Sequence, residues 1–158
     1  MSRNKPKQVL YRRKREKKTN YSKRLNLLIS GTNRLVIRVT NQRVIGQVVE
    51  FTTAGDKVLA AVDSFSLKKL GWEYSYKNFP AAYLCGLLLA KKAGEKGIKQ
   101  AILDTGFTSP LKKGKVYAFL KGVLDGGLEV PHDENVLPDE ERISGGHIKK
   151  YAESIKEK

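Results

Sequence analysis

The sequence predicts an α/β (α+β) fold: a mixed sheet begun by an antiparallel β-meander, with helices packed on it and an extended basic N-terminal arm. Residues 1–43 hold 14 of the 31 Lys and Arg residues and a single acid, which sets the arm apart. Three β-rich segments separated by short turns follow residue 33. Two longer apolar segments with helical spacing then alternate with short strand-like runs, an order typical of a sheet covered by helices.

The arm of this prediction covers residues 1–28. Its first 20 residues have few apolar side chains to bury, so we expect them to be extended or disordered, becoming helical from about residue 12 when a partner is bound. Apolar side chains then recur at Tyr21, Leu25 and Leu28, a helical spacing that ends near Gly31. Residues 29–131 form the predicted globular α/β domain, and residues 132–158 form a polar helical tail.

The meander is predicted from alternating side chains. In the first strand Leu35, Ile37 and Val39 fall on one face, whereas Arg34 and Arg38 fall on the other. A turn at 41–42 leads to a second strand at 44–51, and a turn at 53–56 leads to a third at 58–62. Short connections of this kind join antiparallel neighbours.

Helices and short strands alternate in the second half of the chain. Pro80 suits the start of a helix over residues 81–96, whose broad apolar surface indicates burial against the sheet. A buried strand is predicted at 101–103, a second helix at 114–125 and a last short strand at 128–130. With a weak polar helix from residue 145, the order is β-β-β-α-β-α-(β)-α, with the helices on one face of the sheet.

Positive charge is concentrated at the N-terminal end. The formal net charge is +15, of which residues 1–43 contribute +13 and residues 44–158 only +2. Six cations fall within residues 12–18, a density that opposes folding alone and suits the neutralisation of phosphates. A nuclear-localisation signal or a solubilising tail would have a similar composition. The basic series continues onto the first strand, however, which favours a polyanion partner, RNA or DNA.

The predicted nucleic-acid contacts lie on the arm, on one face of the first two strands and in two loops that precede helices. Arm cations would bind phosphates, and its tyrosines would stack on bases or riboses. Arginines and amides of the sheet would reach phosphates, 2′-hydroxyls and base edges, although an ordinary solvated sheet face has the same pattern. The two loops would offer phosphate sites at helix N-termini. The predicted contacts are Tyr11, Arg12, Arg13, Lys14, Arg15, Lys17, Lys18, Tyr21, Lys23, Arg24, Arg34, Arg38, Asn41, Arg43, Gln47, Lys112, Lys115 and His147.

Other classes of protein fit the sequence less well. Cys85 is the only cysteine and lies in an apolar run, so we predict a buried thiol in a reducing compartment. No apolar stretch approaches the roughly 20 residues that span a bilayer, so no membrane contact is expected. The N-terminus lacks the apolar core of a signal peptide, and it fits a mitochondrial transit peptide only in part.

Two short motifs resemble parts of enzyme sites but lack the fold or the additional residues that such sites need. The Asp-Thr-Gly tripeptide at 104–106 is similar to an aspartic-protease loop, but it lies between predicted helices, where a turn is expected. His132 and the two acids that follow it have no second His or Cys nearby to complete a metal site. We therefore predict no catalytic residue, no metal and no cofactor.

Motifs along nearly the whole chain resemble the 5S rRNA-binding ribosomal protein family of the large subunit, numbered eighteen in bacteria and archaea and five in eukaryotes. The length is similar to that of the archaeal form. In chain order the matching motifs are Tyr11-Arg12-Arg13-Lys14-Arg15-Glu16-Lys17-Lys18-Thr19-Asn20-Tyr21 to Leu28, Arg34-Leu35-Val36, Gly71-Trp72, Asn78-Phe79-Pro80-Ala81-Ala82-Tyr83-Leu84, Leu103-Asp104 to Ser109-Pro110, Lys115-Val116-Tyr117-Ala118, Asp125-Gly126-Gly127-Leu128 with Val130-Pro131-His132, and Gly146-His147-Ile148.

This resemblance implies binding to 5S rRNA and attachment of that RNA to the large-subunit rRNA in the central protuberance. It also implies contacts with neighbouring large-subunit ribosomal proteins, a place in the cytoplasmic ribosome and no catalysis. By position, residues 12–24 with Arg34, Arg38 and Arg43 correspond to RNA-contacting parts of the family. The chain departs from the archaeal pattern at Gly146, where other members have Ala.

Two alternatives belong to other classes. A basic RNA-processing or RNA-modifying enzyme could dock its substrate through the arm, but it would need a cleft with acids or a cofactor. The acids of this sequence are scattered towards its C-terminal end. A DNA-binding chromatin-type protein is disfavoured by the large, nearly neutral α/β body.

Overall fold

The computed structural model describes residues 9–146, and its centre is a four-stranded mixed sheet. Three strands pair antiparallel, and the fourth pairs parallel with the first, which gives the order β3-β2-β1-β4. The strands are β1 (Arg34–Val39), β2 (Val44–Thr52), β3 (Gly55–Asp63) and β4 (Ile102–Asp104). The predicted meander and mixed sheet are confirmed.

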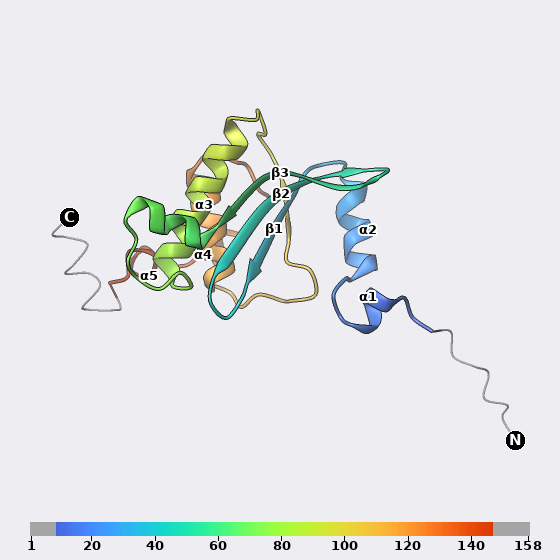
Figure 1. Ribbon diagram of the computed structural model, residues 1–158, viewed down its shortest axis with the longest axis horizontal. Helices are drawn as coiled ribbons and strands as arrows, with labels where there is room; N and C mark the ends of the chain where they lie inside the picture. Colours follow the sequence, from blue (N-terminus) through green and yellow to red (C-terminus); the bar gives the residue numbers. More distant parts are fainter. Residues whose placement is uncertain (1–8, 147–158) are drawn as a thin grey trace, which may run out of the picture.

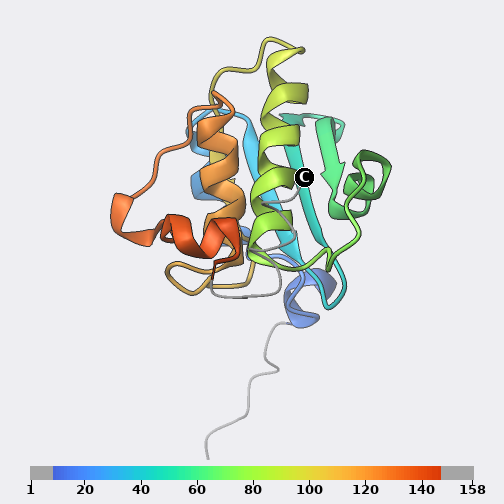
Figure 2. The same cartoon turned by 90° about the vertical axis from the view of Figure 1, so that its left-hand side faces the viewer.

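The sheet separates two layers of helix. The helices α3 (Phe79–Gly94) and α4 (Lys115–Asp125) cover one face, and they lie side by side in front of the strands in Figure 2. The basic arm lies on the other side of the sheet, at the right of Figure 1. Both helices of the body are therefore on one face, as predicted, and the arm occupies the space beyond the opposite face.

Alternation along β1 decides which side chains enter the core. Leu35 and Ile37 are buried beneath the helices, while Arg34 and Arg38 project to the opposite face. We call this opposite face the helix-free face, because neither α3 nor α4 covers it. Val39, at the end of the strand, is partly exposed instead of buried. The turn after β1 is closed by a hydrogen bond from the Thr40 backbone N–H to the Arg43 carbonyl (2.9 Å). That short turn keeps β2 antiparallel to β1.

The helix α3 is the centre of the core. It begins at Phe79, where Asn78 caps it by accepting a hydrogen bond on Oδ1 from the Ala81 backbone N–H (2.8 Å), and Pro80 occupies its first turn. It therefore starts and ends two residues before the predicted bounds. Its buried residues lie on several sides because the sheet and α4 both pack on it. They are Pro80, Ala81, Ala82, Cys85, Gly86, Leu89, Ala90 and Ala93.

Glycines let α3 and α4 approach closely. A Cβ at Gly122 would lie 2.1 Å from the Tyr83 carbonyl oxygen, and a Cβ at Gly86 would lie 2.2 Å from the Phe119 carbonyl oxygen. The side chain of Phe119 in turn fills the space over Gly46 of β2, where a Cβ would lie 2.1 Å from the ring. The distance between the two helices and the sheet is therefore set by residues without side chains.

The C-terminal part differs from the prediction. The expected strand at 128–130 is a single parallel bridge between Gln100 and Glu129. The described residues end in a 3₁₀ helix, η2 (Glu134–Val136), and an α-helix, α5 (Glu140–Ser144), that the sequence did not predict as such. Another unpredicted 3₁₀ helix, η1 (Ser64–Leu70), follows β3 in the middle of the chain. The division of the chain at residues 28 and 131 stays a prediction.

The helix expected from residue 145 lies almost wholly outside the described residues. Gly145 itself ends α5 in the left-handed region, with φ of 81°, which is the usual role of glycine after a helix. The expected phosphate site at a helix N-terminus therefore does not begin at Ser144 or Gly145, because a helix ends there. His147 lies outside the described residues.

Cys85 is fully buried, as predicted. Burial raises the pKa of its thiol to about 12. Within residues 9–146, no helix combines the length and apolar character needed to cross a bilayer.

A methyl group at Gly122 should force α3 and α4 apart. We expect Gly122→Ala to lower the free energy of unfolding by about 2–3 kcal/mol, because the new Cβ meets backbone that cannot move independently. Chemical denaturation measures the change. Gly94→Ala is the matched control, because it adds a methyl group to the end of α3 that points into open space. That control should cost nothing and can gain up to about 0.5 kcal/mol from helix propensity. Equal losses in both variants would contradict this account of the packing.

The buried thiol predicts a loss of stability in alkali. Because the folded state raises the pKa of Cys85, ionisation favours the unfolded chain, and this contribution to stability is lost as pH rises from about 9 towards 12. At pH 10 the wild type should lose about 1 kcal/mol more than Cys85→Ala, relative to each protein at pH 8. Urea titrations at the two pH values measure the difference, and identical losses would exclude the effect.

Candidate nucleic-acid interface

The described part of the arm consists of two short helices joined by a tight turn. These are α1 (Arg12–Arg15) and α2 (Tyr21–Ile29). The helical spacing of residues 21–28 predicted α2, whereas α1 lies where an extended or disordered chain was expected to become helical only with a partner bound. Lys17 follows α1 in the left-handed region, and the Lys18 backbone N–H donates to the Arg13 carbonyl (2.9 Å), a common way for a helix to end. Asn20 caps α2 by accepting from the Lys23 backbone N–H (3.1 Å). Both helix ends are thus satisfied from within the arm.

The one acid of the arm binds only part of its positive charge. Glu16 forms ion pairs with Lys18 and Arg12, both at 2.8 Å, and these cations hold the pKa of its carboxyl below the usual value, Lys18 more than Arg12. The other cations of residues 12–18 form no ion pair with a described residue and are exposed; they are Arg13, Lys14, Arg15 and Lys17. This cluster, the free arm cations, is available to a polyanion.

The two arm tyrosines are in contact. Their rings meet edge to face with centroids 5.8 Å apart, and both rings are exposed. The sequence placed Tyr11 and Tyr21 at the two ends of the basic run, whereas the turn after α1 brings them together. They form one aromatic surface beside the free arm cations. Such a surface suits stacking on an unpaired base.

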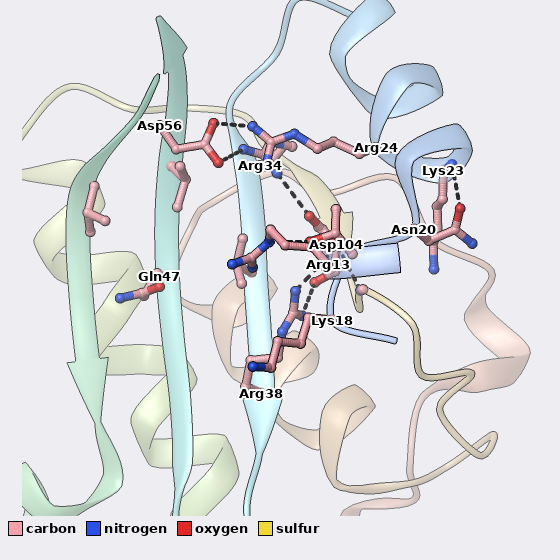
Figure 3. Close-up of a pocket in the computed structure, with 15 residues that line it drawn as sticks. Arg13, Lys18, Asn20, Lys23, Arg24, Arg34, Arg38, Gln47, Asp56 and Asp104 are labelled. Carbon is pink, nitrogen blue, oxygen red and sulfur yellow. Dashed lines mark hydrogen bonds and ion pairs between the residues drawn. The ribbon is translucent and has the colours of Figure 1, made fainter. Parts of the chain in front are cut away.

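A row of alternating charges joins the arm to the helix-free face of the sheet (Figure 3). We call it the arginine–aspartate ladder. Arg24 of α2 binds Asp56 (2.9 Å), Asp56 binds Arg34 (2.7 Å), and Arg34 binds Asp104 (3.1 Å). Arg38 completes it, 3.6 Å from the Asp104 carboxylate and 2.8 Å from the Asp104 carbonyl oxygen. The ladder links α2, β3, β1 and β4.

Arg34 is the buried member of this ladder. The residue is only 3% exposed, and a buried guanidinium is tolerated when carboxylates accompany it. Its Nη1 donates to Asp104. Its Nη2 is ion-paired with Asp56, in a geometry that makes no hydrogen bond, and its Nε has no hydrogen-bond partner among the described residues. The prediction that Arg34 lies on an open sheet face is wrong, because the arm and its ion pairs cover this residue.

A second contact holds α2 against the loop after β4. The Lys23 Nζ donates to the Thr105 hydroxyl (2.8 Å), and Asp104 accepts a hydrogen bond from the Gly106 backbone N–H (2.7 Å). The Asp-Thr-Gly tripeptide is therefore a turn that receives the arm. Lys23, Arg24 and Arg34 are engaged with the protein itself, and contacts of these three with RNA stay predictions.

A cleft of about 230 Å³ remains between the arm and the helix-free face. We call it the arm–sheet cleft. Cations of the arm form one wall, the buried pair Arg34 and Asp104 closes its inner end, and side chains of β1, β2 and β3 form its floor (Figure 3). Its lining residues are Arg13, Lys18, Thr19, Asn20, Lys23, Arg24, Arg34, Val36, Arg38, Gln47, Val49, Asp56, Val58, Asp104 and Gly106.

The other predicted contacts lie outside this cleft. Arg43 pairs with Asp63 (2.7 Å) and lies over the Phe65 ring at 5.2 Å. Asn41 is exposed in the turn between β1 and β2. Lys112 is exposed in the loop before α4, and Lys115 begins that helix. Burial, followed by the nearby Lys77, lowers the pKa of Lys115. The structure thus brings the arm and strand residues together but not the loop lysines.

The two carboxylates of the site, Asp56 and Asp104, were not among the predicted site residues. Asp56 is the second residue of β3 and Asp104 is the last residue of β4, and neither position marks a partner for an arginine. The one sequence feature that could have predicted them is the pair Arg34 and Arg38 on one face of a strand. If that face is covered, its cations need carboxylates as counter-charges. Which acids provide it depends on the parallel pairing of β4 with β1.

The segment that begins at His132, which the sequence predicted to be a loop and not a metal site, has local hydrogen bonds. His132 Nδ1 is 2.8 Å from the Val130 carbonyl oxygen, and Asp133 accepts a hydrogen bond from the Asn135 backbone N–H (3.0 Å). Among residues 9–146, no three His, Cys, Asp or Glu side chains gather closely enough to hold a metal ion.

Comparison with known proteins gives a consistent result. Residues 5–99 match the family described as ribosomal large subunit proteins 60S L5, and 50S L18. The chain is 50% identical over 149 residues to the large ribosomal subunit protein uL18 of Korarchaeum cryptofilum (strain OPF8) and 47% identical over 149 residues to that of Thermofilum pendens (strain DSM 2475 / Hrk 5). Each alignment covers 94% of this chain and 76% of the relative.

Neutralising Asp104 should weaken the fold through Arg34. We expect Asp104→Asn to lower the free energy of unfolding by about 3 kcal/mol, because the buried guanidinium loses a carboxylate while the shape of the side chain is kept. Urea denaturation measures the loss.

The control for this variant is Asp139→Asn, which removes the same charge from the exposed pair with Lys113. It should leave the denaturation midpoint unchanged. A midpoint for Asp104→Asn equal to that of the control would show that the buried ion pair does not stabilise the protein.

Proposed function

The chain belongs to the family of ribosomal large subunit proteins 60S L5 and 50S L18, and from that premise we propose that it binds 5S rRNA and helps attach it to the large-subunit rRNA in the central protuberance. Membership makes it a component of the large ribosomal subunit and not an enzyme, as predicted. The alternatives of an RNA-processing enzyme and a chromatin protein are set aside on that finding. The choice of RNA rests on the motifs that resemble the 5S rRNA-binding family.

One observation carries the proposal: the free arm cations are exposed on a segment that the rest of the protein holds in place. Arg13, Lys14, Arg15 and Lys17 form no ion pair with a described residue, and Lys23 and Arg24 anchor the following helix to the body. A positioned cluster of cations binds phosphates without first ordering every side chain that carries it. The arm therefore supplies affinity from a defined position.

Selectivity would come from the sheet face beside the arm. Phosphate contacts orient a protein on RNA but do not read its sequence. The helix-free face adds the amide of Gln47 and the exposed guanidinium of Arg38, which can reach sugars and base edges of unpaired nucleotides. The aromatic surface of Tyr11 and Tyr21 extends this face along the arm.

The additional partners are large-subunit rRNA and neighbouring ribosomal proteins. Lys112 and Lys115 lie in and after a loop apart from the arm–sheet cleft, so they would meet a different segment of RNA from the one bound by the arm. Asn41 and Arg43, at the far end of β1 and the start of β2, are further candidates. These roles are part of the proposal.

Selective binding is tested with purified full-length protein, 5S rRNA and transfer RNA in a filter-binding assay. We expect tighter binding to 5S rRNA at every salt concentration. If about eight phosphates are neutralised, the slope of log K against log salt should be several units negative. Equal affinity for the two RNAs would refute the specific claim and leave only a general attraction to polyanions.

Removing the free arm cations should abolish most of the affinity without unfolding the body. We expect the triple variant of Arg13, Lys14 and Arg15 to Gln to bind 5S rRNA about 100-fold more weakly, with a salt slope about two units shallower. The control changes Lys68, Lys69 and Lys91 to Gln, three exposed lysines of the body. It removes the same charge and should weaken binding less than about threefold. Equal effects would show that net charge, not the arm, determines binding.

A further inference from the structure

We propose that the arm–sheet cleft receives one unstacked nucleotide of the bound RNA, with the base on the floor of the cleft and the phosphate at its mouth. The inference rests on the proposed function, because it names the part of the RNA that enters this site. Four features of the cleft support it: an apolar floor, an unsatisfied buried donor, an uneven distribution of charge and a suitable size.

Part of the floor is apolar although its surroundings are charged. Val36 of β1, Val49 of β2 and Val58 of β3 line it, and Val49 and Val58 are cross-strand partners. The face carries no helix of the body, and Val58 is 48% exposed. Val36 is partly exposed, whereas Val49 is buried beneath the surface. The open parts of Val36 and Val58 between cations provide a surface for the flat face of a base, which single-stranded recognition commonly uses.

The inner end of the cleft holds a donor without an acceptor. Arg34 lines the cleft and is almost completely buried, yet its Nε has no hydrogen-bond partner among the described residues. Buried donors in proteins are nearly always satisfied. A carbonyl oxygen or ring nitrogen of a base would supply the acceptor. The Gln47 amide, which lines the floor beside it, can both donate to and accept from a base edge.

The charges of the cleft favour one orientation of the nucleotide. At the inner end, Asp56 and Asp104 already neutralise Arg24 and Arg34, so a phosphate there would meet two carboxylates. At the mouth, Arg13 forms no ion pair with a described residue. The Arg38 side chain is 43% exposed, and its Nη2 is 3.6 Å from the Asp104 carboxylate, which is itself 10% exposed. The base therefore enters and the phosphate stays outside, between Arg13 and Arg38.

The size of the cleft limits what can enter. Its volume of about 230 Å³ is far above the roughly 10–15 Å³ that one ordered water requires, and it is below the roughly 300 Å³ at which sites for drug-sized ligands begin. One base fits this range, whereas a stacked run of bases does not. The RNA segment that meets the cleft must therefore turn one nucleotide out of its stack.

The test fills the cleft without changing its charge. Val36→Phe and Val58→Phe each place a ring on the floor, and Ile45→Phe is the matched control, on the same face of β2 but outside the lining. Thermal melting first identifies which plugged variants keep the wild-type fold; Val58, on an outer strand and half exposed, tolerates the larger side chain more readily. Full-length proteins are then titrated with 5S rRNA, and the RNA is probed chemically in each complex.

We expect a folded Val36→Phe or Val58→Phe variant, called here a plugged variant, to bind 5S rRNA roughly ten-fold more weakly than the wild type. The salt slope should not change, because the arm still binds the same RNA phosphates. In the wild-type and Ile45→Phe complexes, one base should be protected from base-specific reagents while its ribose becomes reactive, and the plug should remove that signature. A plugged, folded variant that binds like the Ile45→Phe control, with the same probing pattern, would overturn the inference alone. A wild-type protein without preference for 5S rRNA would overturn the proposed function as well.

Discussion

The helix-free face of this protein depends on the burial of one positive charge. Arg34 is on a central strand, where the arm covers it, and a guanidinium in that position requires carboxylates nearby. Asp56 and Asp104 provide them from the two sides of β1. Because Asp56 also binds Arg24, the same carboxylate that stabilises the sheet holds the arm. The position of the arm follows from the requirement to neutralise Arg34.

The opposite face makes this arrangement possible because it holds the apolar core. Glycines at the contact between α3 and α4 let both helices lie close to the sheet, and Phe119 fills the space over Gly46. With the core complete on that side, β1 can carry Arg34 and Arg38 on its other side without disturbing the packing. The parallel pairing of β4 beside β1 then brings Asp104 next to the arginines. Core and interface are thus the two faces of one strand.

The basic residues of the arm divide into two groups with different tasks. Lys23 and Arg24 bind groups of the body and orient α2. The free arm cations bind no carboxylate among the described residues and remain available to RNA. A fully flexible tail would have to be ordered on binding, at a cost in conformational entropy. Anchoring the base of the arm removes part of that cost and also creates the cleft between arm and sheet.

Much of the fold could be predicted from the sequence because it rests on local patterns. Alternation in residues 34–40 determined the two faces of β1, Pro80 and the apolar run after it predicted α3, and the location of charge predicted a polyanion partner. The tertiary structure alone decided what lies opposite each charge. Arg34 and Arg38 have the same residue type and face, yet one is buried and the other exposed. That difference arises because the arm folds back over one end of the strand and because β4 pairs with β1. These contacts join residues 32 to 70 positions apart, and no local pattern records them.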